Sequence, residues 1–163
     1  MSAKSIKHML TFLVATVCII HPSFGQYPGW HNYYNGDYIY ALADDGSHIW
    51  SGSRFGGLAR MNKVTGETVF YNRINSGLPS NNIDALAIAE DGTVWIGAGK
   101  LVSFDDPVWT VYSSSNSGLP ENSVNCIAID DSGRKWIGTF GEGLALFNDT
   151  TYSPSQSRET VPL

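Results

Sequence analysis

The chain has 163 residues and carries 15 Asp and Glu against 10 Lys and Arg. A chain this acidic offers no basic stripe to neutralise phosphates, which argues against nucleic-acid binding. Its length suits one ordinary domain.

The first 25 residues have the layout of a secretory signal peptide. Lys4 and Lys7 give a basic start, and residues 9–20 (MLTFLVATVCII) form an apolar run. Ser23 and Gly25 are the small residues expected before a cut, which we place after Gly25. A membrane-spanning helix needs about 20 apolar residues, and this run has 12. We therefore expect a periplasmic or secreted chain that is not inserted in the membrane after cleavage.

The two cysteines belong to different parts of the chain. Cys18 would suggest a lipoprotein signal as an alternative, but Val17 precedes it where a small residue is expected. Cys126 is the one cysteine after the predicted cut. We therefore expect no internal disulfide, even in an oxidising compartment.

Three segments of the remaining chain repeat one pattern. Each has a short apolar run, an acidic turn with Gly, a Trp, a Gly two residues later and a second apolar run. The tryptophans are spaced by 45 and 41 residues, and a period of this size indicates a repeat architecture. The structural repeat residues are Trp50, Trp95, Trp136, Gly52, Gly97 and Gly138.

Each repeat reads as four strands. The first is apolar at nearly every position, as in residues 83–89 (IDALAIA) and 124–129 (VNCIAI). This predicts a strand buried on both faces, with Cys126 in the core. The Trp strand and a third strand follow, and residues 67–72 (ETVFYN) and 109–114 (WTVYSS) supply the fourth. No stretch shows a helical period.

An acidic pair stands between the first and second strands of every repeat. With the glycines that follow, these pairs favour tight hairpin turns. Calcium binding or paired-carboxylate catalysis is the alternative, but a catalytic pair is not needed in every repeat. The pairs are Asp44/Asp45, Glu90/Asp91 and Asp130/Asp131.

Four-stranded antiparallel meanders at this period are the blades of a β-propeller. The predicted fold is therefore all-β, with about three blades, an incomplete propeller because closure needs about four to eight. Residues 75–82 (NSGLPSNN) and 116–123 (NSGLPENS) repeat as well. Each would cross from the outermost strand of one blade to the innermost strand of the next, with its Leu filling the wedge between blades.

The string SGLPSNNIDALAIAEDGTVWIG resembles the two-component regulator propeller repeat, because linker, acidic turn and Trp-x-Gly occur together in register. The resemblance covers about residues 36–148. It implies the periplasmic sensor region of hybrid two-component histidine kinases of gut Bacteroidetes-type bacteria, whose members sense glycan fragments. A ligand-binding, sensor-type role in signal transduction follows from it. The chain departs from the family in having three repeats and no membrane helix, kinase or DNA-binding domain.

Two hypotheses about the organisation of the chain remain open. Residues 30–33 (WHNY) match residues 109–112 (WTVY) and could complete a last blade, within one chain or in a neighbour. The chain is then either a truncated propeller without signalling output of its own or a unit that self-assembles into a small secreted lectin-like propeller. The expected parts are a signal peptide at 1–25, an N-terminal segment at 26–36, three repeats within 37–148 (about 37–80, 81–121 and 122–148) and a disordered tail at 149–163.

No sequence motif of an enzyme is present. The chain lacks the Gly-x-Ser-x-Gly, His-Glu-x-x-His and phosphate-binding loop patterns. His31 and His48 have no partner at the same place in another repeat and read as ordinary strand-edge residues. The tryptophans could stack on sugars, but their presence in every repeat favours packing. We expect no catalytic residue, metal or cofactor, and a propeller lyase or glycosidase fragment is the enzyme alternative.

Variable loops give the candidate ligand contacts. Alternate turns of a meander lie at the same end, so the loop between the second and third strands accompanies the linkers, opposite the acidic turns. These loops vary on a constant frame, which is where binding usually resides. We expect Arg54, Phe55, Phe140 and Glu142 to contact a ligand, with Lys100 as a further candidate. An aromatic ring beside a charge suits an oligosaccharide, including an acidic one.

Overall fold

The computed structural model describes residues 38–119 and 123–147. The predicted signal peptide, the segment at 26–36 with its WHNY strand, and the tail at 149–163 lie outside the described residues. Among the described residues, no helix is long and apolar enough to cross a membrane.

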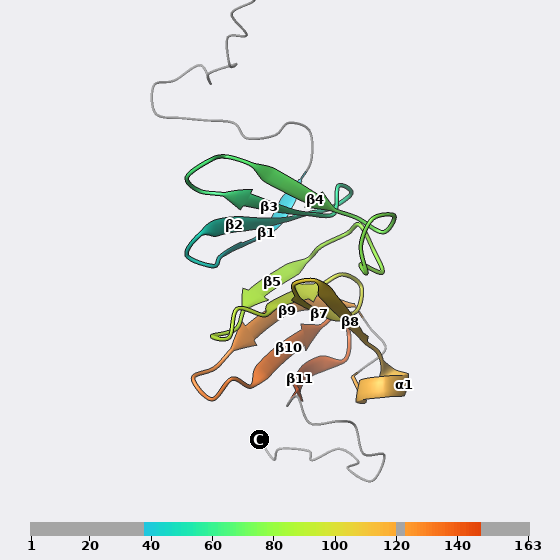
Figure 1. Cartoon of the computed structure of the whole chain (residues 1–163). Helices are drawn as coiled ribbons and strands as arrows, with labels where there is room; N and C mark the ends of the chain where they lie inside the picture. Colours follow the sequence, from blue (N-terminus) through green and yellow to red (C-terminus); the bar gives the residue numbers. More distant parts are fainter. Residues whose placement is uncertain (1–37, 120–122, 148–163) are drawn as a thin grey trace, which may run out of the picture. The chain divides into compact units, whose positions relative to one another are not determined.

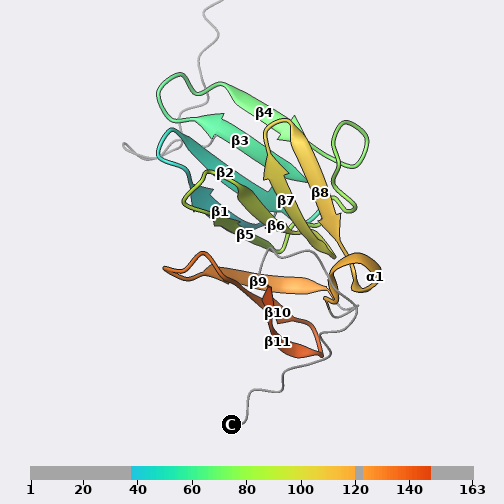
Figure 2. The ribbon, with the colours of Figure 1, turned by 60° about the horizontal axis from the view of Figure 1, so that its bottom comes forward.

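In the part of the chain that the structure describes, three antiparallel sheets follow one another, and strands that are consecutive in sequence pair as neighbours within each sheet (Figures 1 and 2). The predicted all-β fold of propeller blades is thereby confirmed. The sheets comprise β1 (Ile39–Asp44), β2 (His48–Ser53), β3 (Leu58–Asn62) and β4 (Thr68–Tyr71); β5 (Ala85–Ile88), β6 (Val94–Gly97), β7 (Leu101–Asp105) and β8 (Val108–Tyr112); and β9 (Val124–Ile129), β10 (Lys135–Thr139) and β11 (Gly143–Phe147).

A short helix, α1 (Ser114–Ser117), follows β8. It begins where we expected the fourth strand of the second repeat to continue as far as residue 114. Ser113 explains the difference, because its carbonyl accepts hydrogen bonds from Asn116 and Ser117 and so closes a helical turn. Gly118, in the left-handed region with φ 69°, ends that turn. The linker therefore begins with a turn of helix.

Register assigns equivalent positions to the three sheets. The glycine of each Trp-x-Gly pairs with a third-strand Leu: Gly52 with Leu58, Gly97 with Leu101 and Gly138 with Leu144. Directly opposed residues share a face of an antiparallel sheet. The face of each sheet that holds Trp50, Trp95 or Trp136 is called here its tryptophan face, and the face that holds Ile49, Ile96 or Ile137 its isoleucine face.

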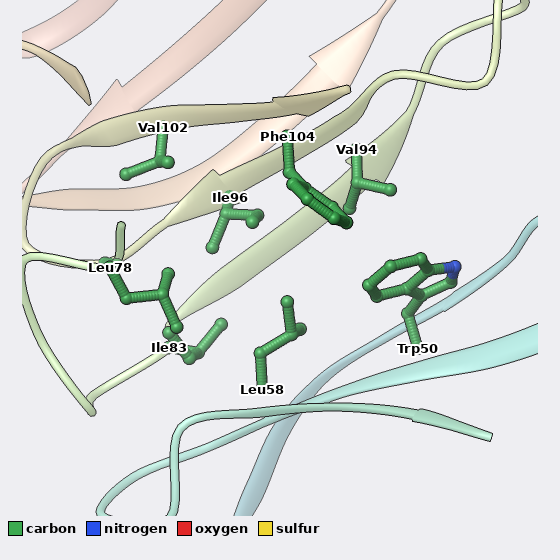
Figure 3. Packing of buried hydrophobic residues seen from close by; sticks show 9 residues of the cluster. Trp50, Leu58, Leu78, Ile83, Val94, Ile96, Val102 and Phe104 are labelled. Atoms are coloured by element: carbon green, nitrogen blue, oxygen red, sulfur yellow. The ribbon is translucent and has the colours of Figure 1, made fainter. Parts of the chain in front are cut away.

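The first hydrophobic cluster joins the tryptophan face of the β1–β4 sheet to the isoleucine face of the β5–β8 sheet. Figure 3 shows Trp50 and Leu58 on one side, with Val94 and Phe104 on the other. The Trp50 ring meets Phe104 edge-on, with their centroids 6.0 Å apart. Leu78, from the first linker, is 4% exposed within this cluster, in agreement with its expected role as a wedge.

The second cluster repeats the first at equivalent positions. Trp95 and Leu101 pack with Ile137 and Phe147, and Leu119 from the second linker is 6% exposed there. The ring centroids of Trp95 and Phe147 lie 5.7 Å apart. One packing rule therefore joins the sheets twice: a tryptophan face lies against the isoleucine face of the next sheet.

Glycine in Trp-x-Gly lets neighbouring sheets approach. A Cβ built on Gly52 would overlap the side chain of Ile83, which leads into β5. A Cβ on Gly97 would lie 2.9 Å from the carbonyl oxygen of Val124, at the start of β9. Both contacts are closer than carbon atoms tolerate, so the motif requires glycine for packing between sheets.

Two sequence predictions about burial are wrong. The first strands β1 and β9 are not buried on both faces, and Cys126 is exposed rather than in the core. Ala85, at the position equivalent to Cys126, is 5% exposed because β9 of the next sheet packs beside β5. No described sheet covers the tryptophan face that carries Cys126. Burial of a first strand therefore depends on the following sheet.

Candidate functional site

The two ends of each sheet have different chemistry, as the meander topology predicts. At one end, the β2–β3 loop meets the first linker, since Gly57 N–H donates to Asn81 O at 3.0 Å. At the other end, the acidic turn meets the β3–β4 turn, since Lys63 N–H donates to Ser47 O at 3.0 Å. We call the first the loop end and the second the acidic end.

Arg54 contacts several exposed aromatic residues at the loop end. Its guanidinium lies over the Phe55 ring, 5.3 Å from the centroid, and Nη1 donates to the Tyr40 hydroxyl at 3.4 Å. Its backbone N–H donates to Tyr38 O at 3.0 Å, so β1 and the β2–β3 loop are fixed together. The rings are 51–67% exposed. Tyr38, Tyr40, Arg54 and Phe55 form the arginine–aromatic cluster.

The carboxyl of Asp84 is close enough to Arg54 to interact with its charge. Partial burial raises the pKa of its carboxyl, and the positive charge of Arg54 opposes that rise. Among the described residues, no carboxylate forms an ion pair with Arg54.

Phe140 and Glu142 occupy the turn between β10 and β11. Phe140 is 74% exposed, and its N–H donates to Ser123 O at 2.9 Å. Glu142 is exposed as well. Among the described residues, no hydrogen bond, ion pair or ring contact joins this turn to Arg54 or Phe55. The structure therefore brings Arg54 and Phe55 together but not Phe140 and Glu142 with them.

Lys100 borders a hollow that the sequence did not indicate. The hollow, of about 340 Å³, is lined by Lys100, Tyr112, Thr139 and hydroxyl side chains of residues 113–115. The Tyr112 hydroxyl is within hydrogen-bonding distance, 3.3 Å, of Ser103 Oγ. The polar groups of this hollow are a cation, a phenol and several hydroxyls, and the apolar side chains of Leu101, Leu119 and Val124 complete its lining. The one signal in the sequence is the hydroxyl-rich run before the second linker.

The acidic turns at the other end use their carboxylates within the fold. Asp45 accepts hydrogen bonds from the N–H groups of Ser47 and His48, and its Oδ2 accepts one from Trp50 Nε1 at 2.8 Å. Burial raises the pKa of Asp45, but these hydrogen bonds outweigh it and leave the pKa below its ordinary value. His48 Nδ1 also lies 3.2 Å from Asp45 Oδ2, a structural contact.

Asp130 repeats this arrangement in the third sheet. Its Oδ2 accepts a hydrogen bond from Trp136 Nε1 at 2.9 Å and pairs with Arg134 Nε at 2.7 Å. The indole contributes most to lowering the pKa of Asp130 to about 2. The sequence indicated these turns but not the carboxylate–indole bonds inside them.

A hollow of about 450 Å³ opens among the acidic turns, bordered by Asp44, Asp45, Glu90, Asp130 and Asp131. Within residues 38–119 and 123–147, no three His, Cys, Asp or Glu side chains lie so as to hold a metal ion. The carboxylate oxygens of Asp45 and Asp130 already accept hydrogen bonds from turn N–H groups and from indoles. We therefore place the candidate functional surface at the loop end.

Comparison with known proteins places the chain in a class. Solved structures share its fold, including the extracellular domain of a protein assigned as a hybrid two-component system from B. thetaiotaomicron (21% identity, TM-score 0.60). A second such domain from the same organism is 22% identical, with a TM-score of 0.56. They align with 76% and 72% of this chain, which spans 18% and 16% of theirs. A search of curated proteins finds no match.

The chain thus has the β-propeller fold, and its repeats also match a family of known sequences. The sequence model of the two-component regulator propeller family matches residues 77–100 and 118–141. Each match runs from a linker glycine through the acidic turn and the Trp-x-Gly motif. Two segments of the chain therefore match the two-component regulator propeller repeat, and the resemblance found in its sequence is confirmed.

Proposed function

We propose that this chain supplies ligand-binding blades to a sensor-type propeller outside the cytoplasm, and that its ligand is an oligosaccharide with acidic groups. The observation that carries the proposal is the Arg54 guanidinium, held over the exposed Phe55 ring beside the Tyr40 hydroxyl. The family repeats and the likeness to extracellular domains of two-component systems support a sensing role. We propose binding without catalysis.

The chemistry of the arginine–aromatic cluster favours a sugar that bears a carboxylate. A sugar ring presents C–H groups that stack on an exposed aromatic face such as Phe55. A carboxylate beside that ring can accept two parallel hydrogen bonds from Arg54. Tyr40, which is 51% exposed and lies beside the guanidinium, adds a hydroxyl for the sugar's own hydroxyls. We propose that Phe140, Glu142 and Lys100 contact further units of the same ligand.

Calorimetric titration with a matched pair of probes tests this proposal. Oligogalacturonate and its methyl ester differ in charge but not in ring geometry. We expect the unesterified oligomer to bind more tightly, because only it can pair with the guanidinium. Arg54→Ala should weaken that binding about tenfold or more, since a charged hydrogen bond contributes about 1.5–3 kcal/mol and about 1.4 kcal/mol is tenfold in affinity.

Two further variants control the experiment. Arg54→Lys keeps the charge but loses the planar fork, so it should recover only part of the affinity. Lys63→Ala removes an equal charge at the acidic end and should leave binding unchanged. The proposal is wrong if Arg54→Ala binds the acidic oligomer as well as the original chain, or if neither oligomer binds.

A further inference from the structure

The tryptophan face of the third sheet repeats a docking surface that is covered in the other two sheets. Leu58 and Leu101 are 0% exposed, because the following sheet packs on them. Leu144 occupies the same register position opposite Gly138 and is 68% exposed. Its neighbour on that face, Leu146, is 44% exposed. Two leucines with this exposure on one face of a sheet indicate an interaction surface.

Gly138 stands at the equivalent position of Trp-x-Gly on the same face. The equivalent Gly52 and Gly97 receive Ile83 and Val124 from the next sheet. A Cβ on Gly138 would meet atoms of Cys126 from its own sheet. The third sheet keeps glycine at this position, with the Cys126 thiol in the space that Ile83 and Val124 approach in the first two sheets.

The isoleucine face of the first sheet supplies the complementary surface. Leu42 is 66% exposed there, whereas Leu86 and Ile127, at equivalent positions, pack into the two clusters. Ile49 stands where the second and third sheets have Val94 and Lys135. Lys135 lies over the Trp95 ring, with Nζ 4.7 Å from the centroid. In the same register, Ile49 would lie over a tryptophan of a preceding sheet.

We propose that the tryptophan face of the third sheet binds the isoleucine face of the first sheet of a second copy of this chain. Every copy carries both surfaces, and the packing rule that joins them already holds twice within the chain. The contact is head-to-tail, so it closes a ring or extends a chain of copies. The described residues of two copies bring six sheets, within the range of about four to eight blades of closed propellers.

This inference is independent of the proposed ligand. It uses Leu42, Leu144 and Gly138 and none of the arginine–aromatic cluster. The Arg54→Ala variant should therefore associate like the original chain. Failure of ligand binding and failure of association are read from different variants.

Light scattering after size exclusion, on the chain expressed in full, tests the proposal. We expect the original chain to elute as a dimer. Leu144→Glu and Leu42→Glu should each halve the measured mass, because each places a charge in the apolar contact. Val64→Glu, at a residue that is 93% exposed in the β3–β4 turn, should leave the mass unchanged.

Mixing the two monomeric variants gives the decisive result. Leu144→Glu retains the isoleucine face, and Leu42→Glu retains the tryptophan face, so a one-to-one mixture should recover the dimer mass through one intact contact. Only folded variants can complement each other, which controls for misfolding. A monomeric original chain, a single variant that stays dimeric, or a mixture that stays monomeric would each overturn the proposal.

Discussion

The indole nitrogen of Trp95 differs from those of the other two repeat tryptophans. It is buried and has no hydrogen-bond partner, whereas Asp45 and Asp130 accept from the indoles of their own sheets. Ala89 stands at the equivalent place, since its N–H donates across the turn as those of the two aspartates do. A buried donor without an acceptor costs about 1–3 kcal/mol, so the second sheet carries a local defect in stability.

We predict that Ala89→Asp stabilises the fold by about 1 kcal/mol, because the new carboxylate can accept from Trp95 Nε1. Urea unfolding of the original and the variant measures the change. The same substitution in a Trp95→Phe background should give no gain, since the indole N–H is gone. An equal gain in both backgrounds would contradict the explanation.

Asp130 makes the stability of the fold depend on pH in the acidic range. Hydrogen bonds from Trp136 and Arg134 lower its pKa from 3.8 to about 2, so the folded chain holds the charged form more strongly than the unfolded chain does. That contribution is complete above the ordinary pKa and is lost as the pH falls towards the folded value.

We therefore predict that Asp130→Asn flattens the fall in melting temperature between pH 3.8 and about 2. Asp131→Asn removes one acidic side chain next to it, keeps the Asp130–Trp136 bond and is the charge control. NMR of the carboxyl groups measures the pKa of Asp130 directly. An Asp130 titration midpoint at or above 3.8 in the folded chain would contradict the assignment.

At the scale of structural elements, one added methyl group between two sheets should change the free energy of unfolding. Gly52→Ala should destabilise the fold by about 1–3 kcal/mol, the usual cost of overpacking, because its Cβ would overlap Ile83. In an Ile83→Ala background, the added cost should be smaller, since the overlapping side chain is gone. A double-mutant cycle by chemical unfolding measures this coupling. Strictly additive costs would contradict a direct contact.

The strands themselves could be predicted well from sequence, for a physical reason. Local alternation, turn glycines and a fixed period determine which residues form strands, and β9 begins and ends where the sequence predicted, at Val124 and Ile129. Burial is different, because it depends on which sheet comes next. Cys126 lies in the mostly apolar run of residues 124–129, yet it is exposed because no described sheet covers its face.

On the scale of the whole molecule, topology predicted the loop end but not the contacts within it. The alternation of turns places Arg54 and Phe55 opposite the acidic turns, and this follows from the meander alone. The approach of Arg54 to Tyr40 depends on how β1 lies against the β2–β3 loop. The hollow beside Lys100 depends on α1 and the third sheet, which no local pattern encodes.

Ligand mapping by NMR tests the account most directly. Backbone amide shifts of the isotope-labelled chain would be followed during titration with oligogalacturonate. We expect saturable shifts centred on Tyr40, Arg54 and Phe55, with little change at the acidic end. Saturable shifts centred on the acidic turns, or no shifts at any concentration, would contradict a ligand-binding role for the loop end.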